Sequence, residues 1–278
     1  VMMISPDYDR FARAYDSGEA QIVSTRLVAD LETPVSAKLK LARNARYSFL
    51  LESVEGGAVR GRYSIIGLNP DLIWKVSNGQ ASINRQAGRD PDGPFEKIEL
   101  APLQALRALL AESRINLPED APPMAAGVFG YMGYDMVRFM EDLPDPKPDT
   151  LGLPDAMLIR PTIMAIFDSV RDEVSVTSPV YPEAGLSARA AYMRATERIT
   201  GIVEALDRPL DHLALRQPDA PPINSPRSNT TPEEYKAMVL KAKEHIAAGD
   251  IFQVVLSQRF ETEFTLPPFA LYLSLIHI

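Results

Sequence analysis

The chain has 278 residues, of which 46% are hydrophobic, enough to build one large domain or two small ones. It contains no cysteine and three histidines, which excludes disulfides and thiolate metal sites and disfavours a zinc site. A formal net charge of -8 with scattered basic residues argues against nucleic-acid binding. The sequence shows no leader-like N-terminus and no apolar run of bilayer length, so we expect a cytoplasmic protein without membrane contact.

The first half of the chain predicts strands mixed with helices. Gln21 to Asp30 is typical of a strand, and a helix is expected after Pro34. Asn78-Gly79 lies between alternating runs and favours the type I′ turn of a two-residue hairpin. Leucines between Leu103 and Leu110 then recur at helical spacing.

The stretch from Tyr47 to Asp71 joins two apolar runs by a polar loop. The first run is apolar on both faces until Glu52, as in a strand covered on both sides. Acceptors Glu52 and Ser53 are followed by donors Arg60 and Arg62, a combination that could hold a small zwitterion. The simpler alternative is that Glu52 and Ser53 end a strand and that Arg62 is a solvated surface charge.

Glycines recur at every third residue in the segment Gly127, Gly130 and Gly133. Glycine weakens a strand, so its repetition indicates that another backbone or side chain approaches closely. Two interpretations remain open, a strand packed against a ligand-bearing partner and ordinary close sheet packing, and the second is the simpler one.

The later part of the first domain continues the mixed pattern. A short helix is expected from Asp135 to Leu143, then two strands about a turn at Asp168 to Glu173, and then a long helix from Leu186 to Leu206. That helix would turn Ala190, Met193, Ile199 and Val203 to related faces. Paired antiparallel strands with separate helices predict an α+β fold rather than a βαβ repeat.

A second structural unit is expected to begin near Thr231. Arg216 to Thr230 is proline-rich and is predicted to be a linker. Thr231, Pro232 and Glu234 then form a capping-box start for a helix that Gly249 would end. The helix is predicted to bury Tyr235, Met238, Val239, Ala242 and Ile246, and Ile251 to Phe264 is predicted to be a strand.

Three segments resemble component I of anthranilate synthase, in order along the chain from about Tyr47 to Tyr272. They are LLESVEGG with RYSIIGLNPD, then GVFGYMGYDMVRFMEDLP, then TPEEYKAMVLKAKEHIAAGDIFQVVLSQRF. The resemblance implies an α+β N-terminal regulatory domain over 1–215, a linker over 216–230 and the first helix and strand of a chorismate-binding domain over 231–272. The residues 273–278 depart from the family pattern and are expected to be a non-native tail.

The resemblance also implies an activity. Magnesium-bound chorismate would be attacked by ammonia from a glutamine amidotransferase subunit, and pyruvate would be eliminated to give anthranilate, with feedback inhibition by L-tryptophan. Ser53 would be the main tryptophan contact, with Glu52 beside it, Leu51 as an apolar wall and Arg62 serving the ligand carboxylate. The catalytic residues and the magnesium ligands are expected beyond Tyr272, so that the chain is an inactive fragment.

Two other functions stay open. A related chorismate enzyme, such as aminodeoxychorismate synthase component I, would share the later fold, although LLES favours the tryptophan-regulated member. The chain could alternatively be a stand-alone tryptophan-binding module rather than an enzyme.

Overall fold

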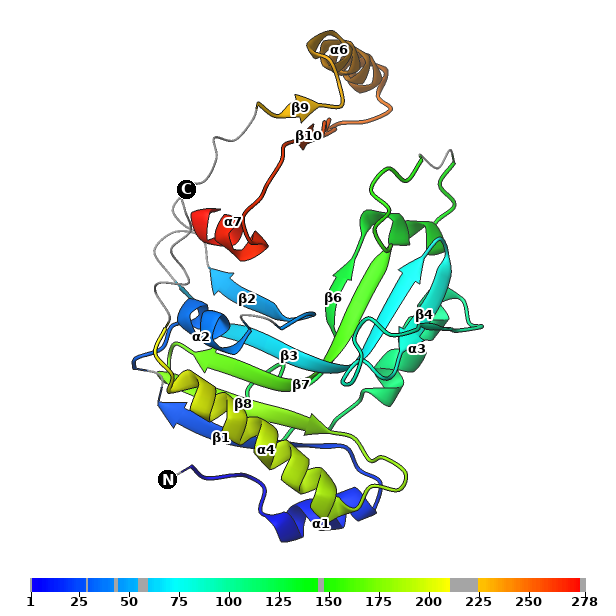
Figure 1. The fold of residues 1–278 in the computed structure, drawn as a ribbon. Helices are drawn as coiled ribbons and strands as arrows, with labels where there is room; N and C mark the ends of the chain where they lie inside the picture. The colour runs from blue at the N-terminus through cyan, green and yellow to red at the C-terminus, as the bar shows by residue number, and fades with distance from the viewer. Residues whose placement is uncertain are drawn as a thin grey trace. The chain divides into compact units, whose positions relative to one another are not determined.

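The computed structural model describes residues 2–28, 30–42, 45–54, 60–144, 148–210 and 225–275. Contacts between residues divide the chain into two compact units, Val1–Leu210 and Asp211–Ile278, here called unit 1 and unit 2 (Figure 1). Residues 211–224 and 276–278 lie outside the described residues. The predicted limits of the linker and of the tail therefore stay predictions.

Unit 1 is built on one antiparallel sheet whose long central strands are β3 (Arg60–Ser77) and β7 (Ala156–Asp168). The other strands are β1 (Gln21–Val28), β2 (Phe49–Val54), β4 (Gln80–Asn84), β5 (Glu96–Lys97), β6 (Phe129–Met132) and β8 (Glu173–Val180). The strand order is β1-β8-β7-β3-β4-β5, with β2 added on β3 and β6 added on β7. The predicted α+β class is confirmed.

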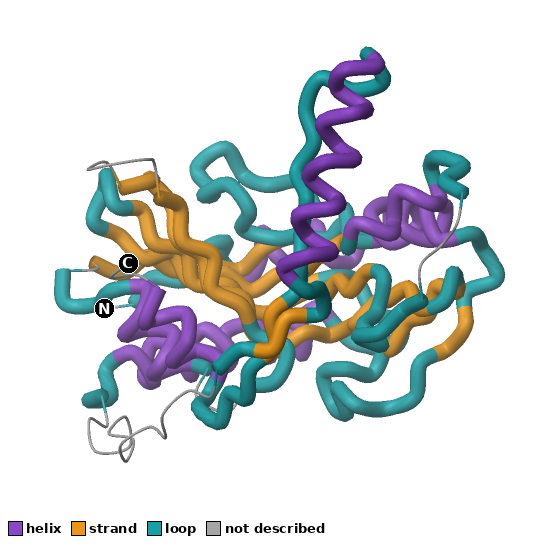
Figure 2. Tube along the Cα trace, turned by 90° about the horizontal axis from the view of Figure 1, so that it is seen from above, coloured by secondary structure: helices purple, strands orange, loops and turns teal. Residues whose placement is uncertain are grey.

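The two central strands belong to two half-sheets. Along its first half β3 lies between β2 and β7, and along its second half it lies between β4 and β7. Similarly, β7 pairs with β6 near its start and with β8 near its end. The strands thus form one connected, twisted band (Figure 2). The run ending at Asp71 and the first strand of the Asn78-Gly79 hairpin both belong to β3.

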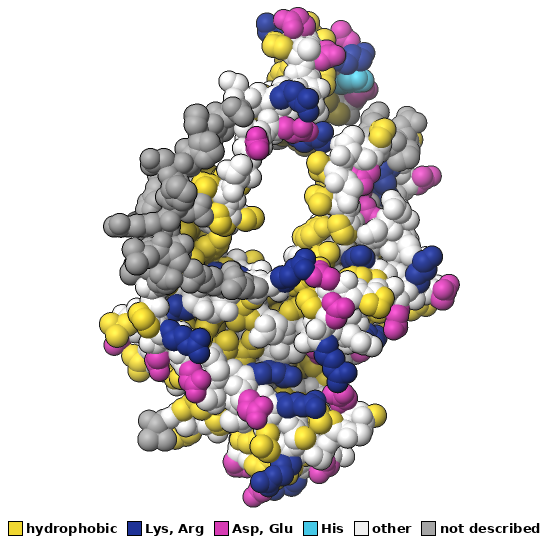
Figure 3. Space-filling view, viewed as in Figure 1, with side chains coloured by type: hydrophobic (Ala, Val, Ile, Leu, Met, Phe, Trp, Pro, Cys, Tyr) yellow, Lys and Arg dark blue, Asp and Glu magenta, His cyan; other side chains and the backbone are white. Residues whose placement is uncertain are grey.

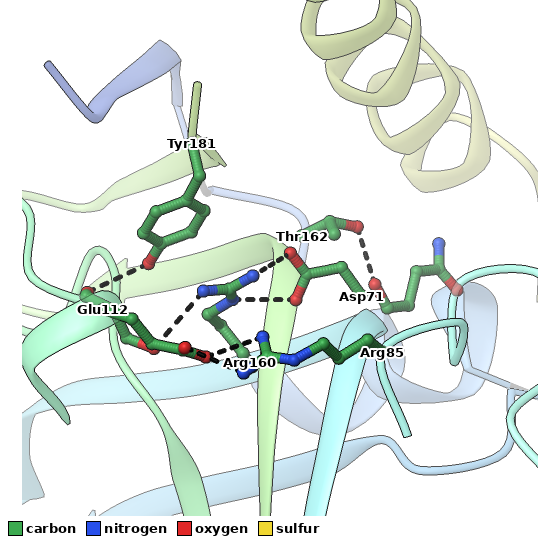
Figure 4. Close-up of polar contacts among 8 residues, drawn as sticks. Asp71, Arg85, Glu112, Arg160, Thr162 and Tyr181 are labelled. Carbon is green, nitrogen blue, oxygen red and sulfur yellow. Dashed lines mark hydrogen bonds and ion pairs between the residues drawn. The ribbon is translucent and has the colours of Figure 1, made fainter. Parts of the chain in front are cut away.

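The change of direction between the half-sheets occurs at a bulge. The register of β3 on β7 shifts between Pro70 and Leu72, which leaves Asp71 as the extra residue. Arg160, on β7, donates two hydrogen bonds to the Asp71 carboxylate, from Nε at 2.9 Å and from a terminal nitrogen at 2.7 Å (Figure 4). The Arg160 guanidinium also lies 4.0 Å from the centre of the Tyr181 ring. An ion pair therefore holds the bulge on the central strand.

Helices cover one face of each half-sheet. In the first half, α1 (Tyr8–Asp16), α2 (Pro34–Leu41) and α4 (Ala188–Leu206) share a core with β1, β3, β7 and β8 that includes Phe11, Val23, Ile66, Ile163 and Ile199. In the second half, α3 (Pro102–Glu112) covers Trp74, Val76, Ile83 and Leu158. The opposite face of the sheet carries a third cluster around Ile65, Met164 and Ile166.

Local sequence signals account for several turns. Ser77 pairs with Gln80, and Asn78 and Gly79 both have positive φ, which confirms the two-residue hairpin. A Cβ added to Gly130 would lie 2.0 Å from the carbonyl oxygen of Met157 on the neighbouring strand. Of the two interpretations of the repeated glycines, close sheet packing is therefore the one found at Gly130.

Two expectations for helices in unit 1 need correction. The segment after Gly133 forms only a 3-10 helix, η1 (Tyr134–Phe139). In α4 the buried residues are Ala188, Ala191, Ala195, Ile199, Ile202 and Leu206, whereas Met193 is 52% exposed. The helical period alone did not predict which residues of α4 are buried, because small alanines face the sheet where the helix packs closely.

Unit 2 contains α6 (Pro232–Ala248), a two-stranded ladder and α7 (Pro268–Leu275). The capping box of Thr231 and Glu234 and the left-handed Gly249 confirm the predicted start and end of α6. No residue of α6 is buried, so the predicted buried stripe was wrong for this chain.

The predicted strand Ile251 to Phe264 was also wrong in its extent. Only Phe260 and Glu261 form a strand, β10 (Phe260–Glu261), and they pair with β9 (Arg227–Ser228). A strand needs a neighbour for its backbone groups, and in the described part of unit 2 only two residues offer one.

Candidate functional site

The candidate site lies on β2, at the point where this strand meets the start of β3. The pairing of Leu50 with Ile66 and of Leu51 with Ile65 sets which face each side chain uses. Leu50 packs into the helix-covered core with Ile66, whereas Ile65 belongs to the cluster on the opposite face. Strand alternation then puts Phe49, Leu51 and Ser53 on the face opposite the helices.

A stacked pair of aromatic rings, here called the aromatic floor, borders this face. The rings of Phe49 on β2 and Phe129 on β6 stack with their centres 4.8 Å apart. Gly67 makes this possible, because a Cβ there would lie 2.3 Å from the Phe49 ring. Beyond this floor Leu51 is 49% exposed, and Ser53 is exposed as well. The side chains of Leu51 and Ser53 therefore lie on one accessible face of the strand.

Glu52 does not share that surface. It pairs with Ser64 in the ladder and is half-buried. Its place in the alternation turns it to the same side as Leu50, toward the helices. The structure thus separates Glu52 from Ser53 and Leu51, three residues that the sequence had grouped.

Ser53 lies at an irregularity of the ladder. Glu52 pairs with Ser64 and Val54 pairs with Arg60, so Ser53 faces three residues of β3, from Gly61 to Tyr63. Gly61 is the close neighbour: an added Cβ would lie 2.0 Å from the Ser53 Oγ and 2.7 Å from its carbonyl oxygen. The hydroxyl of Ser53 therefore occupies the space that a side chain at position 61 would need.

The Arg62 side chain is bonded to Asp168. Its guanidinium donates two hydrogen bonds to Asp168, from Nε at 3.0 Å and from a terminal nitrogen at 2.8 Å. These bonds raise the pKa of Arg62 and lower the pKa of Asp168 from its usual value. Arg62 also lies 4.9 Å from the centre of the Tyr63 ring. To bind a ligand carboxylate, the Arg62 guanidinium would have to exchange Asp168 for it.

A second basic group lies near the start of β2. Lys38 on α2 donates a hydrogen bond of 2.7 Å to the Ser48 hydroxyl. Burial lowers the pKa of Lys38 to about 8, because the charged ammonium loses water there. This side chain links α2 to the segment leading into the site.

A polar cavity of about 520 Å³ lies in another part of unit 1. It is bordered by the N-terminal segment, β1, β8 and the loop 116–122, and its lining includes Arg10, Ser24, Arg26 and Thr177. Arg26 is paired with Asp120 of that loop at 2.8 Å. None of the four residues predicted from the sequence lines this cavity.

The described residues contain no group of three or more histidine, aspartate or glutamate side chains that could hold a metal ion. The part of the chain that the structure describes therefore does not fit a magnesium site. In the described ranges no helix is long and apolar enough to cross a membrane. Acidic and basic side chains are interspersed over the face shown in Figure 3.

Sequence reasoning missed the neighbours of Ser53. Gly61 stands between two arginines without a turn motif, and Asp168 and Ser169 are about a hundred residues away. Only the β3–β7 ladder, in which Tyr63 pairs with Asp168, brings them to the site. Asp168 was recognised as part of a turn, but no local signal indicated its bond to Arg62.

Comparisons with known proteins give a consistent result. The sequence profile of a family described as chorismate binding enzyme matches residues 47–278. Anthranilate synthase component 1 of Cereibacter sphaeroides is 51% identical over 278 residues, covering 96% of this chain and 53% of the relative. The Synechocystis sp. protein of the same name is 37% identical, covering 98% of this chain and 54% of the relative.

A solved structure supports the fold. Anthranilate synthase component I from Streptococcus pneumoniae superposes with a TM-score of 0.60 at 25% identity, covering 90% of this chain and 51% of the other. This chain spans about half the length of the relatives that it matches.

Proposed function

Because the chain belongs to the family of chorismate-binding enzymes, we propose that it is the N-terminal, regulatory portion of an anthranilate synthase large subunit. The observation that carries the proposal is the 51% identity to a component 1 protein over nearly the whole chain. The complete subunit would convert chorismate and ammonia to anthranilate, pyruvate and water. A glutamine amidotransferase subunit would supply the ammonia by hydrolysing glutamine.

Magnesium is proposed for the complete subunit and not for a site in the described part of this chain. Magnesium prefers carboxylate oxygens in near-octahedral arrangement, and the described residues offer no acidic cluster of that kind. We therefore assign no step of the reaction to residues of this chain. An assay of the 278-residue chain with chorismate, ammonia and magnesium should give no anthranilate. Product formation would contradict the proposal that the reaction needs residues of the complete subunit that this chain does not supply.

The proposed role of unit 1 is to bind L-tryptophan as a feedback inhibitor at Ser53. The hydroxyl of the exposed Ser53 can accept a hydrogen bond from the ligand ammonium, and the half-exposed Leu51 can contact the indole. Phe49 and Phe129 lie on the same face and extend its apolar surface. The contacts of Glu52 and Arg62 with the ligand stay predictions from the resemblance, because Glu52 lies on the other face of the strand and Arg62 is bonded to Asp168.

Calorimetric titration with L-tryptophan tests this role. Titration of the 278-residue chain should give a saturable heat signal. Ser53→Ala should weaken binding at least about tenfold, since one hydrogen bond to a charged group contributes about 1.5–3 kcal/mol. Ser17→Ala, at the exposed end of α1, is the matched control and should bind normally. Equal affinity of Ser53→Ala and the intact chain would refute a site centred on Ser53.

The same titration separates the tryptophan-regulated enzyme from its relatives. If folded protein gives no heat with L-tryptophan, a chorismate enzyme without this feedback is favoured. Product analysis of the complete subunit then decides, because aminodeoxychorismate synthase places the amino group para to the carboxylate.

A further inference from the structure

Ser53 is held at its position by residues that need not touch any ligand. Where Ser53 faces β3, the partner strand has three residues opposite one, and this excess interrupts the regular ladder. Gly61 lies at the closest approach, with 2.0 Å between an added Cβ and the Ser53 Oγ and 2.4 Å to the Ser53 Cβ. Both contacts are below any distance that real Cβ atoms adopt. Any side chain at Gly61 must therefore move Ser53 or open the ladder.

The turn between β7 and β8 holds the irregular segment from the other side. The backbone nitrogen of Ser169 donates to the carbonyl oxygen of Arg62 at 2.9 Å, and the Ser169 hydroxyl donates to the same oxygen at 3.1 Å. The Ser169 hydroxyl also lies 3.3 Å from the carbonyl oxygen of Gly61. The backbone of Gly61 and Arg62 is thus fixed by a residue from a distant part of the chain.

Asp168 couples this contact to the turn itself. Its Oδ1 accepts from Arg62 Nε at 3.0 Å and from the backbone nitrogens of Val170 at 3.1 Å and Arg171 at 3.3 Å. Its Oδ2 accepts from the other end of the Arg62 guanidinium at 2.8 Å. Only 12% of the Asp168 side chain is exposed, so these bonds are partly shielded from water. One carboxylate therefore orders the turn and holds the Arg62 side chain.

We propose that Gly61 is a positioning residue for Ser53, and that Asp168 and Ser169 hold Gly61 and Arg62 in the conformation that presents the Ser53 hydroxyl. This inference rests on the proposed tryptophan site. It assigns Arg62 a structural bond to Asp168 instead of a contact with the ligand carboxylate. Tryptophan affinity then depends on the turn between β7 and β8. The pairing of β3 with β7 places this turn against Gly61 and Arg62, which lie opposite Ser53.

The main test compares two glycine variants of the 278-residue chain. Gly61→Ala should weaken L-tryptophan binding in calorimetry at least about tenfold, comparable to the loss of the Ser53 hydrogen bond itself. Gly201→Ala is the matched control: Gly201 lies in α4 with nothing within 4 Å of an added Cβ, so binding should not change. In the Ser53→Ala background, Gly61→Ala should add little further loss, because both changes act on one hydroxyl.

A second measurement does not need the ligand. Amide hydrogen exchange of Phe49–Val54 should be faster in Gly61→Ala than in Gly201→Ala, because the β2–β3 ladder must open locally. Unchanged exchange in these residues would overturn the positioning role even if tryptophan did not bind. If Ser53→Ala binds tryptophan normally, the proposed function fails; if Ser53→Ala loses binding and Gly61→Ala does not, only the present inference fails.

Asp168→Asn separates the two roles of Arg62. If Arg62 holds the backbone through Asp168, the variant should bind tryptophan several-fold more weakly. If Arg62 instead contacts the ligand carboxylate, its release from Asp168 should leave binding equal or tighter. The second result would overturn the assigned role of Arg62.

Discussion

The partly buried ion pair of Arg160 and Asp71 should stabilise unit 1 more than the exposed pair of Arg85 and Glu112 drawn beside it (Figure 4). Both pairs have two hydrogen bonds of similar length, 2.9 and 2.7 Å against 3.0 and 2.9 Å. They differ in exposure, because the Arg160 side chain is 12% exposed and the Arg85 side chain is 51% exposed. The two methionine variants, Arg160→Met and Arg85→Met, therefore compare two carboxylate pairs that differ in burial, and Arg160→Met also removes a hydrogen bond of 3.4 Å to Ser113 and the contact with Tyr181.

The structure sets the expected magnitudes. Losing one partner of a fully buried pair costs about 3–5 kcal/mol, and an exposed pair contributes roughly 0–1 kcal/mol. The Asp71 side chain is 34% exposed and can recover some hydration after the change, so we expect about 2–3 kcal/mol for Arg160→Met. Part of this is the contact with the Tyr181 ring. Arg85→Met should cost no more than about 1 kcal/mol.

Urea denaturation followed by tryptophan fluorescence measures the difference. Trp74 is the one tryptophan of the sequence and is fully buried under α3, so its emission reports on unit 1. For Arg160→Met, the urea concentration at the unfolding midpoint should be well below that for Arg85→Met. The m value, the slope of the unfolding free energy against urea concentration, should be unchanged. Losses within about 0.5 kcal/mol of each other would refute the reasoning that burial decides the contribution.

Three further outcomes follow from other contacts. Gly130→Ala should lower the thermal midpoint by many degrees, because its Cβ would lie 2.0 Å from a carbonyl oxygen, while Gly201→Ala should leave it unchanged or slightly raised; equal melting curves would contradict the glycine argument. The lowered pKa of Asp168, caused mainly by its bond from Arg62, means that this pair stabilises the fold above about pH 4 and that the contribution is lost as pH falls through the lowered pKa. The stability gap between the intact chain and Asp168→Asn, measured by urea titration at several pH values, should therefore shrink in acid and not in base. Thr231→Ala should remove the N-cap of α6 and cost about 1 kcal/mol of helix stability, seen as faster amide exchange in its first turn, and unaltered exchange would show that the cap contributes nothing.

Much of the architecture could be predicted from local signals in the sequence. The Asn78-Gly79 turn, the capping box at Thr231 and the stop at Gly249 are short-range features, in which side chains act on their own backbone. These features depend on residues that are near in sequence, and they appear in the structure as predicted. The alternation through Leu51 likewise placed β2, but the strand is not covered on both sides as expected, because Leu51 is 49% exposed.

Partners distant in sequence were decided only by the tertiary structure. The resemblance grouped Leu51, Glu52, Ser53 and Arg62 at one site. In the structure, strand alternation turns Glu52 away, and the β3–β7 ladder brings Asp168 to Arg62. The extent of β10 also depended on which backbone was available to pair with it. A residue's chemical type can be read from the chain, whereas its available donors, its face and its neighbours depend on register, and register is set by strands that lie far apart in sequence.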